Sequence, residues 1–273
     1  MKVGIIFKKE RDLLQFESKQ FTQIMPYARH AANHQPNIKS SMIDLTHADN
    51  QIQCVTTFNE LVATPFVGNI NALCWERKLL GDFAEIVEKI ELLENITAIE
   101  PDELLALQLS EQGNLARQTI LADWNLLKTH GAQPTLNIIK NYDRDDTHPL
   151  IPTDVYSFHV DHSPVPTDTF LCTYLGQASE ILPNAQAQQK VLIPAIRNQL
   201  KQLYTGPDDG FETYLSEHFF DLHYQPNPHA QTINLGIGHL WRLAVDYPES
   251  KVPACVHRAP QEKDGEPRLL LIC

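Results

Sequence analysis

The stretch FHVDHSPVPTDTFLCTYLG at residues 158–176 places His159, Asp161 and His162 just ahead of an apolar run at 170–175. Residues two apart in a β-strand point to the same face, so His159 and Asp161 can converge on one ion, whereas His162 points to the opposite face. The cluster is therefore either half of a metal site or an ordinary polar strand end, since turn regions also favour such residues.

Strand-like segments continue on both sides of this stretch. Runs of β-forming residues bounded by Pro, Gly and Asp predict strands at 134–142, 154–161, 168–176, 229–245, 254–260 and 267–273. Apolar periodicity predicts two helical blocks between them, at 185–204 and 208–222.

The N-terminal half has a different pattern. Apolar residues recur at three- and four-residue intervals from 79 to 93, Pro101 begins a further helix, and Gly131 is a suitable end, so 79–130 is predicted to be helical. We therefore expect an α+β protein with a mostly helical region at 1–130 that packs on a β core at 131–273, with a helical insertion at about 185–225. Residues 1–70 show only short apolar runs, and the chain lacks the glycine-rich loop of a nucleotide-binding sheet.

Composition limits the compartment and the partners. The 273 residues include five cysteines without a CxxC pair, which predicts a reducing compartment. The net charge of −12 and the scattered basic residues disfavour nucleic acid and anionic membranes. Neither a secretory signal core nor a run long enough to span a bilayer is visible, so we expect a soluble, cytoplasmic protein. The sequence does not predict the oligomeric state.

A third metal ligand must come from elsewhere in the chain, and His257 in CVHRAP follows a short predicted strand. Two histidines and a carboxylate on one face leave three coordination positions open, which suits non-haem Fe(II). Arg268 stands eleven residues after His257 and begins the last apolar strand. Its guanidinium is suited to bind a carboxylate co-substrate beside the iron.

This order of H-x-D, distant His and Arg on a strand resembles the Fe(II)/2-oxoglutarate-dependent oxygenases. The resemblance covers about 134–273 without the insertion, and it implies a double-stranded β-helix core of the jelly-roll or cupin-like kind. The approach LNIIKNYDRDDTHPLIPTDVYSFHVD is similar to that of the prolyl hydroxylases, which implies that Tyr142 helps to bind the oxoacid. Thr173 and Tyr174 can also hydrogen-bond its carboxylate, although a core or surface role suits them equally.

A second resemblance covers about 70–273. The blocks CWER, FHVD, CTYLG, VHRAP and PRLLL follow the order found in a bacterial family of uncharacterised proteins. Where that family continues CTY with G-P-G-T-E-W, this chain has LGQASEIL, so the pocket lid or the substrate is expected to differ. The resemblance names no activity, but it supports treating His159, Asp161, His257 and Arg268 as one site.

The leading hypothesis is an Fe(II)/2-oxoglutarate-dependent oxygenase, most simply a hydroxylase of a small molecule or a protein side chain, with Arg268, Tyr142 and Thr173 binding the oxoacid. The alternative is a non-enzymatic metal-binding or metal-homeostasis protein that uses the same triad for zinc or iron. A third reading is an interaction scaffold with an acidic surface. The further histidines His218, His223 and His229 are interpreted as surface or pocket-lining residues, because a helix would not bring His218 and His223 to one face.

Overall fold

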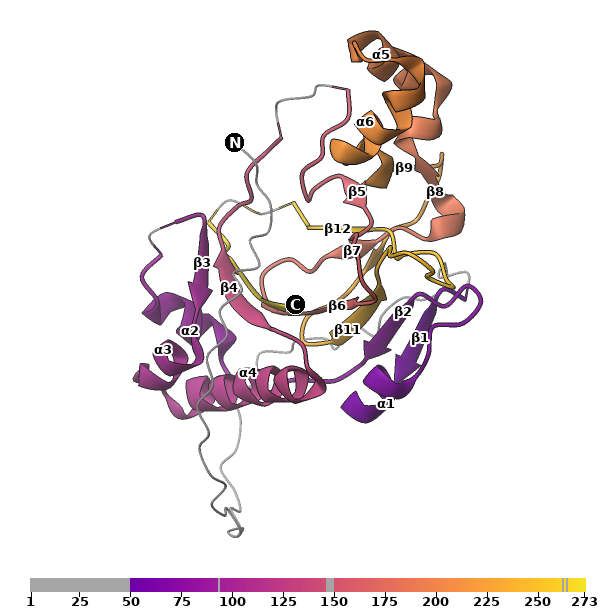
Figure 1. Ribbon diagram of the computed structural model, residues 1–273. Helices are drawn as coiled ribbons and strands as arrows, with labels where there is room; N and C mark the ends of the chain where they lie inside the picture. The colour runs from indigo at the N-terminus through magenta and orange to yellow at the C-terminus, as the bar shows by residue number, and fades with distance from the viewer. Residues whose placement is uncertain (1–49, 93, 146–149, 262, 264) are drawn as a thin grey trace, which may run out of the picture. The chain divides into compact units, whose positions relative to one another are not determined.

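The computed structural model describes residues 50–92, 94–145, 150–261, 263 and 265–273. Residues 1–49 lie outside this range, and they make up most of the 1–70 segment in which the sequence shows only short apolar runs. The described residues form two β-sheets and six α-helices, which confirms the expected α+β class (Figure 1).

The larger sheet, called the main sheet, is curled. In the described chain its strands lie in the order β1 (Ile52–Val55), β2 (Ala72–Trp75), β11 (Leu240–Ala244), β6 (Asp168–Leu175), β13 (Arg268–Ile272), β4 (Thr135–Ile139) and β3 (Ile96–Ile99). β1 and β2 are parallel, and all other neighbours in this order are antiparallel.

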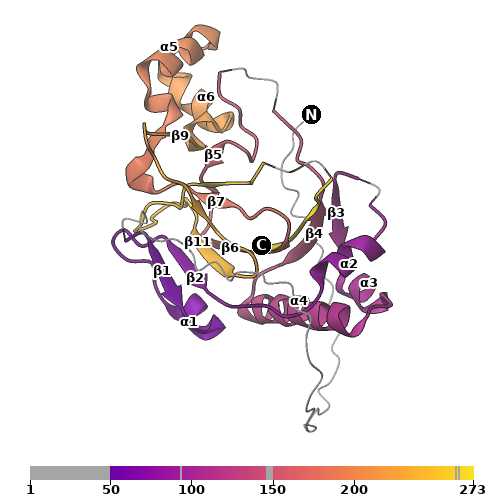
Figure 2. The ribbon, with the colours of Figure 1, turned by 180° about the vertical axis from the view of Figure 1, so that it is seen from behind.

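The second sheet, called the small sheet, is built from short antiparallel strands. Among the described residues their order is β10 (Ile233–Asn234), β7 (Glu180–Ile181), β12 (His257–Arg258), β5 (Phe158–His159), β9 (His223–Pro226) and β8 (Ala187–Gln189). β5, β7 and β12 lie above β6 and β11 in Figure 1, and β5 and β7 do so again in the reverse view of Figure 2.

The chain alternates between the two sheets. β4, β6, β11 and β13 belong to the main sheet, whereas β5, β7, β10 and β12 belong to the small sheet. The facing surfaces share one apolar core, in which Ile181 and Ile233 of the small sheet pack with Leu171, Trp241 and Leu270 of the main sheet. This alternation brings residues far apart in sequence to the same inner space.

Helices cover the outer face of the main sheet and form the insertion. Their bounds are α1 (Phe58–Ala63), α2 (Phe83–Lys89), α3 (Pro101–Ala106), α4 (Glu111–His130), α5 (Pro194–Leu203) and α6 (Phe211–Glu217), with 3-10 turns η1 (Asn184–Gln186), η2 (Lys190–Leu192), η3 (Asp208–Gly210) and η4 (Phe220–Leu222). α4 ends where the sequence predicts, because Gly131 adopts the left-handed conformation at φ 100° that closes a helix.

The N-terminal region is less helical than expected. β1, β2 and β3 arise within the described part of 1–130 and join the main sheet. β3, with the sequence ITAI, interrupts the predicted helical stretch at 79–130 because its β-branched residues pair with β4. A short apolar run of this kind is compatible with a helix or a strand, and here the pairing with β4 determines that it forms a strand.

The insertion also differs in detail. The helix predicted from 185 begins at Pro194, which occupies the first turn, and the residues before it form η1, β8 and η2. An apolar cluster of its own holds the insertion together, with Leu200, Phe211 and Phe220 fully or almost fully buried.

A buried ion pair fastens α4 to the main sheet. Arg77, just after β2, donates two hydrogen bonds of 2.5 Å to the carboxylate of Asp123 on α4, and Tyr174 on β6 donates a third at 2.6 Å. The side chain of Asp123 is 2% exposed. A buried carboxylate needs such compensation, because the desolvation of an unpaired charge is costly.

We expect Asp123→Asn to lower the free energy of unfolding by about 3–5 kcal/mol, because the change leaves the Arg77 guanidinium without its counter-charge. Urea denaturation at fixed metal content measures this loss. The control is Asp208→Asn, which breaks the exposed Lys201–Asp208 pair and should have little effect. Equal stabilities for the two variants would contradict this role of the buried pair.

Candidate metal centre

Strand pairing brings the predicted histidines together. His159 on β5 lies directly opposite His257 on β12, with their ring centroids 4.6 Å apart. Residues directly opposite in antiparallel strands project to the same face. Because Ile181 is the next partner of His257 and belongs to the core between the sheets, both imidazoles project to the inner face of the small sheet.

The backbone sets the orientation of both imidazole rings in the same way. Nδ1 of His159 lies 2.8 Å from the carbonyl oxygen of Ser157, and Nδ1 of His257 lies 3.1 Å from that of Cys255. A carbonyl can only accept, so each Nδ1 carries the proton and each Nε2 presents its lone pair. Metal-binding histidines use this arrangement, in which the second ring nitrogen donates to a carbonyl.

The carboxylate of Asp161 completes the cluster. Oδ1 lies 3.8 Å from Nε2 of His159, and Oδ2 lies 3.6 Å from Nε2 of His257. Thr169 on β6 donates a hydrogen bond of 2.5 Å to Oδ2 and so fixes the carboxylate from the main sheet. One ligand atom from each member of this triad lies within 4.8 Å of the others, a geometry that can hold a metal ion.

The protonation of the triad also favours a cation. Burial and the neighbouring His257 lower the pKa of His159 to about 4, so its ring is neutral near pH 7. Burial alone would raise the pKa of Asp161, but His257, His159 and the hydrogen bond from Thr169 outweigh it and keep the pKa below its usual value. A neutral imidazole and an ionised carboxylate bind a metal without first losing a proton.

The predicted oxoacid-binding residues also converge. Arg268 is buried, and its guanidinium donates to Oγ1 of Thr173 at 2.9 Å and lies 3.4 Å from the hydroxyl of Tyr142. A further hydrogen bond of 2.8 Å goes to Oγ of Ser179, a residue that no sequence pattern marks as part of the site. Tyr142 lies beyond the end of β4, rather than on the strand predicted for 134–142.

The remaining histidines have different environments. His162 faces away from the triad and hydrogen-bonds Asp246 at 2.8 Å on the surface. His218 and His229 are exposed. His223, however, is the other cross-strand partner of His159 and is only 5% exposed. It lies on β9 rather than on a helix, so its approach to the triad depends on strand pairing that the sequence does not reveal.

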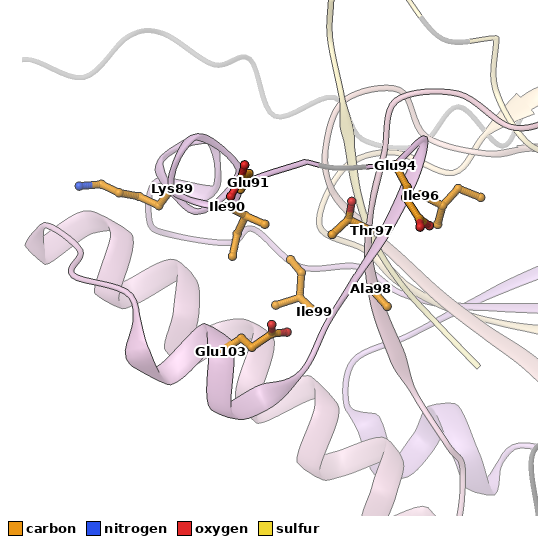
Figure 3. A pocket seen from close by; sticks show the side chains of 9 residues that line it. All are labelled: Lys89, Ile90, Glu91, Glu94, Ile96, Thr97, Ala98, Ile99 and Glu103. Carbon is orange, nitrogen blue, oxygen red and sulfur yellow. The ribbon is translucent and has the colours of Figure 1, made fainter.

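A separate hollow of about 450 Å³ lies beside α2, β3 and α3, among Lys89, Glu94 and Thr97 (Figure 3). Neither the members of the triad nor Arg268 line this hollow. It is therefore distinct from the candidate metal centre.

Comparison with known proteins gives a family match for one part of the chain. Residues 153–273 match the model of a family described as "Protein of unknown function (DUF1826)". This region contains the triad and Arg268, and the match supports the expected likeness to a family of uncharacterised proteins. Neither the curated proteins nor the solved structures gave a match.

Among the described residues, helix length and apolarity fall short of what a membrane crossing requires.

We expect His257→Ala and Asp161→Ala to abolish stoichiometric metal binding, because each removes one of the triad ligands. Metal analysis of the purified variants and titration with Fe(II) under anaerobic conditions measure this. His162→Ala is the matched control and should retain the metal, since its ring faces Asp246. Unchanged metal content in the triad variants would rule out this centre.

The lowered pKa of His159 predicts a pH-dependent stability of the metal-free protein. Between about pH 6.5 and about pH 4 the unfolded chain binds a proton that folded His159 does not, so stability falls with falling pH, by up to about 1.4 kcal/mol per pH unit for this group. Urea denaturation of chelator-treated protein should show a smaller slope in His159→Asn. An equal slope in the two proteins would contradict the neutral, buried state of this ring.

Proposed function

We propose that the protein is an Fe(II)/2-oxoglutarate-dependent oxygenase, acting as a hydroxylase, on a double-stranded β-helix core. The observation that carries the proposal is the pair of polar groups on the inner face of β6. Thr169 holds the triad carboxylate, and Thr173, four residues along the same face, binds the buried guanidinium of Arg268. The two threonines are about 13 Å apart along the strand, a separation that the facing side chains and a five-carbon oxoacid can span.

The strand order supports the proposed core. β4, β13, β6 and β11 are neighbours in the main sheet, and β10, β7, β12 and β5 are neighbours in the small sheet. Successive strands of this set alternate between the sheets, apart from the consecutive small-sheet strands β7 and β10. Eight antiparallel strands in two facing sheets are the architecture of jelly rolls and cupins.

The donor set fits the proposed iron. His159, Asp161 and His257 offer two imidazole nitrogens and one carboxylate from one side, and this leaves positions open for ligands that are not protein groups. Iron bound there would activate dioxygen, the oxidant, and the oxidative decarboxylation of 2-oxoglutarate would accompany the hydroxylation of a C–H bond. The protein itself orients the three ligand side chains. The Nδ1 hydrogen bonds orient the two imidazoles, and Thr169 orients the carboxylate of Asp161.

Arg268 would anchor the distal carboxylate of the oxoacid. Its guanidinium is oriented by Thr173 and Ser179, and the hydroxyl of Tyr142 lies beside it. Burial strengthens the attraction between a fixed guanidinium and a carboxylate, because little water competes for either. The apolar core around Leu171 and Leu270 keeps water away from this part of the inner space.

The proposed substrate is a small molecule or a protein side chain, which would reach the triad from the side of the small sheet and the insertion. Nucleic acid is a poor candidate because of the net charge of −12. A non-enzymatic zinc- or iron-binding protein is the second candidate, since the same triad fits zinc. Arg268 favours the oxygenase, because a metal-storage site needs no buried carboxylate anchor.

We expect anaerobic addition of Fe(II) and 2-oxoglutarate to produce a metal-to-ligand charge-transfer band in the visible region. Arg268→Met should weaken 2-oxoglutarate binding by about 30-fold or more, the cost of removing one partner of a buried charge pair, while Fe(II) binding persists. Arg258→Met is the matched control, because Arg258 pairs with Glu180 and packs over Phe158 on the opposite face of the small sheet. Fe(II) binding without any band would favour the metal-binding alternative.

A further inference from the structure

The inner face of the small sheet carries polar side chains beyond the triad. His257, His159 and His223 are successive cross-strand partners on β12, β5 and β9. Gln189, the last residue of β8, pairs with Tyr224, which is the neighbour of His223 in sequence. Lys190 directly follows Gln189 and therefore lies beside His223 in the same antiparallel register. The cross-strand row that contains the two ligands His257 and His159 therefore continues through His223 to Lys190.

His223 differs from the two ligand histidines. Its ring lies 5.8 Å from that of His159, centroid to centroid, but it is not part of the set whose ligand atoms converge. The carbonyl two residues before it, that of Asp221, accepts a hydrogen bond from Gln189. Within the described chain, Nδ1 of His223 is therefore buried without a hydrogen-bond partner. Such an orphaned polar atom is costly unless a water molecule or a ligand satisfies it.

Lys190 supplies a positive charge at the same place. Its ammonium donates to Oγ of Ser157 at 2.8 Å, and the carbonyl of Ser157 in turn orients His159. Among the residues that the structure describes, no carboxylate lies within ion-pair distance of Lys190. Burial lowers the pKa of Lys190. Burial, His159 and the charge of Lys190 together lower the pKa of His223, so the two groups share one environment.

Two acidic residues, Asp145 and Asp154, lie near enough to influence these groups. Asp154 accepts backbone hydrogen bonds from Tyr156, Ser157 and Asp145, and Asp145 accepts from the backbone and hydroxyl of Thr153. Their oxygens thus serve the loop before β5, and the ammonium of Lys190 keeps N–H groups to offer to another acceptor.

We infer that Lys190 and His223 form a subsite for a carboxylate group next to the metal centre. The single positive charge of Lys190 and a neutral imidazole N–H match one singly charged carboxylate better than a phosphate. If the proposed function holds, on which this assignment to the substrate rests, the substrate is a carboxylic acid whose reacting carbon is positioned by this contact. The carboxylates of 2-oxoglutarate would be held elsewhere, by Arg268 and the metal.

The probe is acetate, titrated into full-length, chelator-treated protein while the imidazole nitrogen resonances of His223 are followed by NMR. The absence of metal prevents acetate from binding as a metal ligand. We expect saturable shifts, an affinity about tenfold weaker in Lys190→Met, the scale of one charged hydrogen bond, and retention in Lys190→Arg. Arg268→Met, which removes the buried guanidinium assigned to the oxoacid, should leave the affinity unchanged. Inorganic phosphate should bind more weakly than acetate.

Several results would overturn the inference. They are the absence of saturable shifts, equal acetate affinity in Lys190→Met and the natural protein, loss of binding in Arg268→Met alone, or tighter binding of phosphate than of acetate. Near-natural acetate binding by Lys190→Arg shows that the site folds with a cation at this position. The iron and 2-oxoglutarate titration on the same preparation separates the two proposals. Acetate binding through Lys190 without a charge-transfer band would reject the oxygenase and keep the carboxylate subsite.

Discussion

The candidate site depends on the register between two very short strands, β5 and β12. Each has only two residues, yet their pairing sets His159 directly opposite His257. A slip of one residue would turn one imidazole to the other face of the sheet. The neighbouring residues resist such a slip, because Phe158, Val160 and Val256 are buried together on the outer face. Apolar packing on one face thus fixes ligand geometry on the other.

β6 connects this local geometry to the rest of the fold. Phe170, Cys172 and Tyr174 on one face pack in the cluster that also contains residues of the helices, whereas Thr169 and Thr173 on the other face bind Asp161 and Arg268. Strand alternation therefore ties the helical layer, the metal centre and the guanidinium to a single element. The buried ion pair of Arg77 and Asp123, to which Tyr174 also donates, anchors the helical side of this arrangement.

The parts of the site that depend on local spacing can be predicted from the sequence. His159 and Asp161 follow from an i, i+2 pattern, and His257 and Arg268 follow from their order relative to predicted strands. The contacts that depend on long-range pairing were not accessible. Ser179 and His223 join the site only because β7, β5 and β9 pair as they do, and nothing near either residue in the sequence signals this. The strands β1, β2 and β3 were missed for the same reason, since short apolar runs acquire their structure from their partners.

The triad as an iron site is tested most directly by a crystal structure of the protein grown anaerobically with Fe(II) and measured at the iron absorption edge. We expect one anomalous peak within bonding distance of Nε2 of His159, Nε2 of His257 and a carboxylate oxygen of Asp161, with Nδ1 of both rings still donating to the carbonyls of Ser157 and Cys255. A peak at other ligands, or no peak between these three side chains, would contradict it.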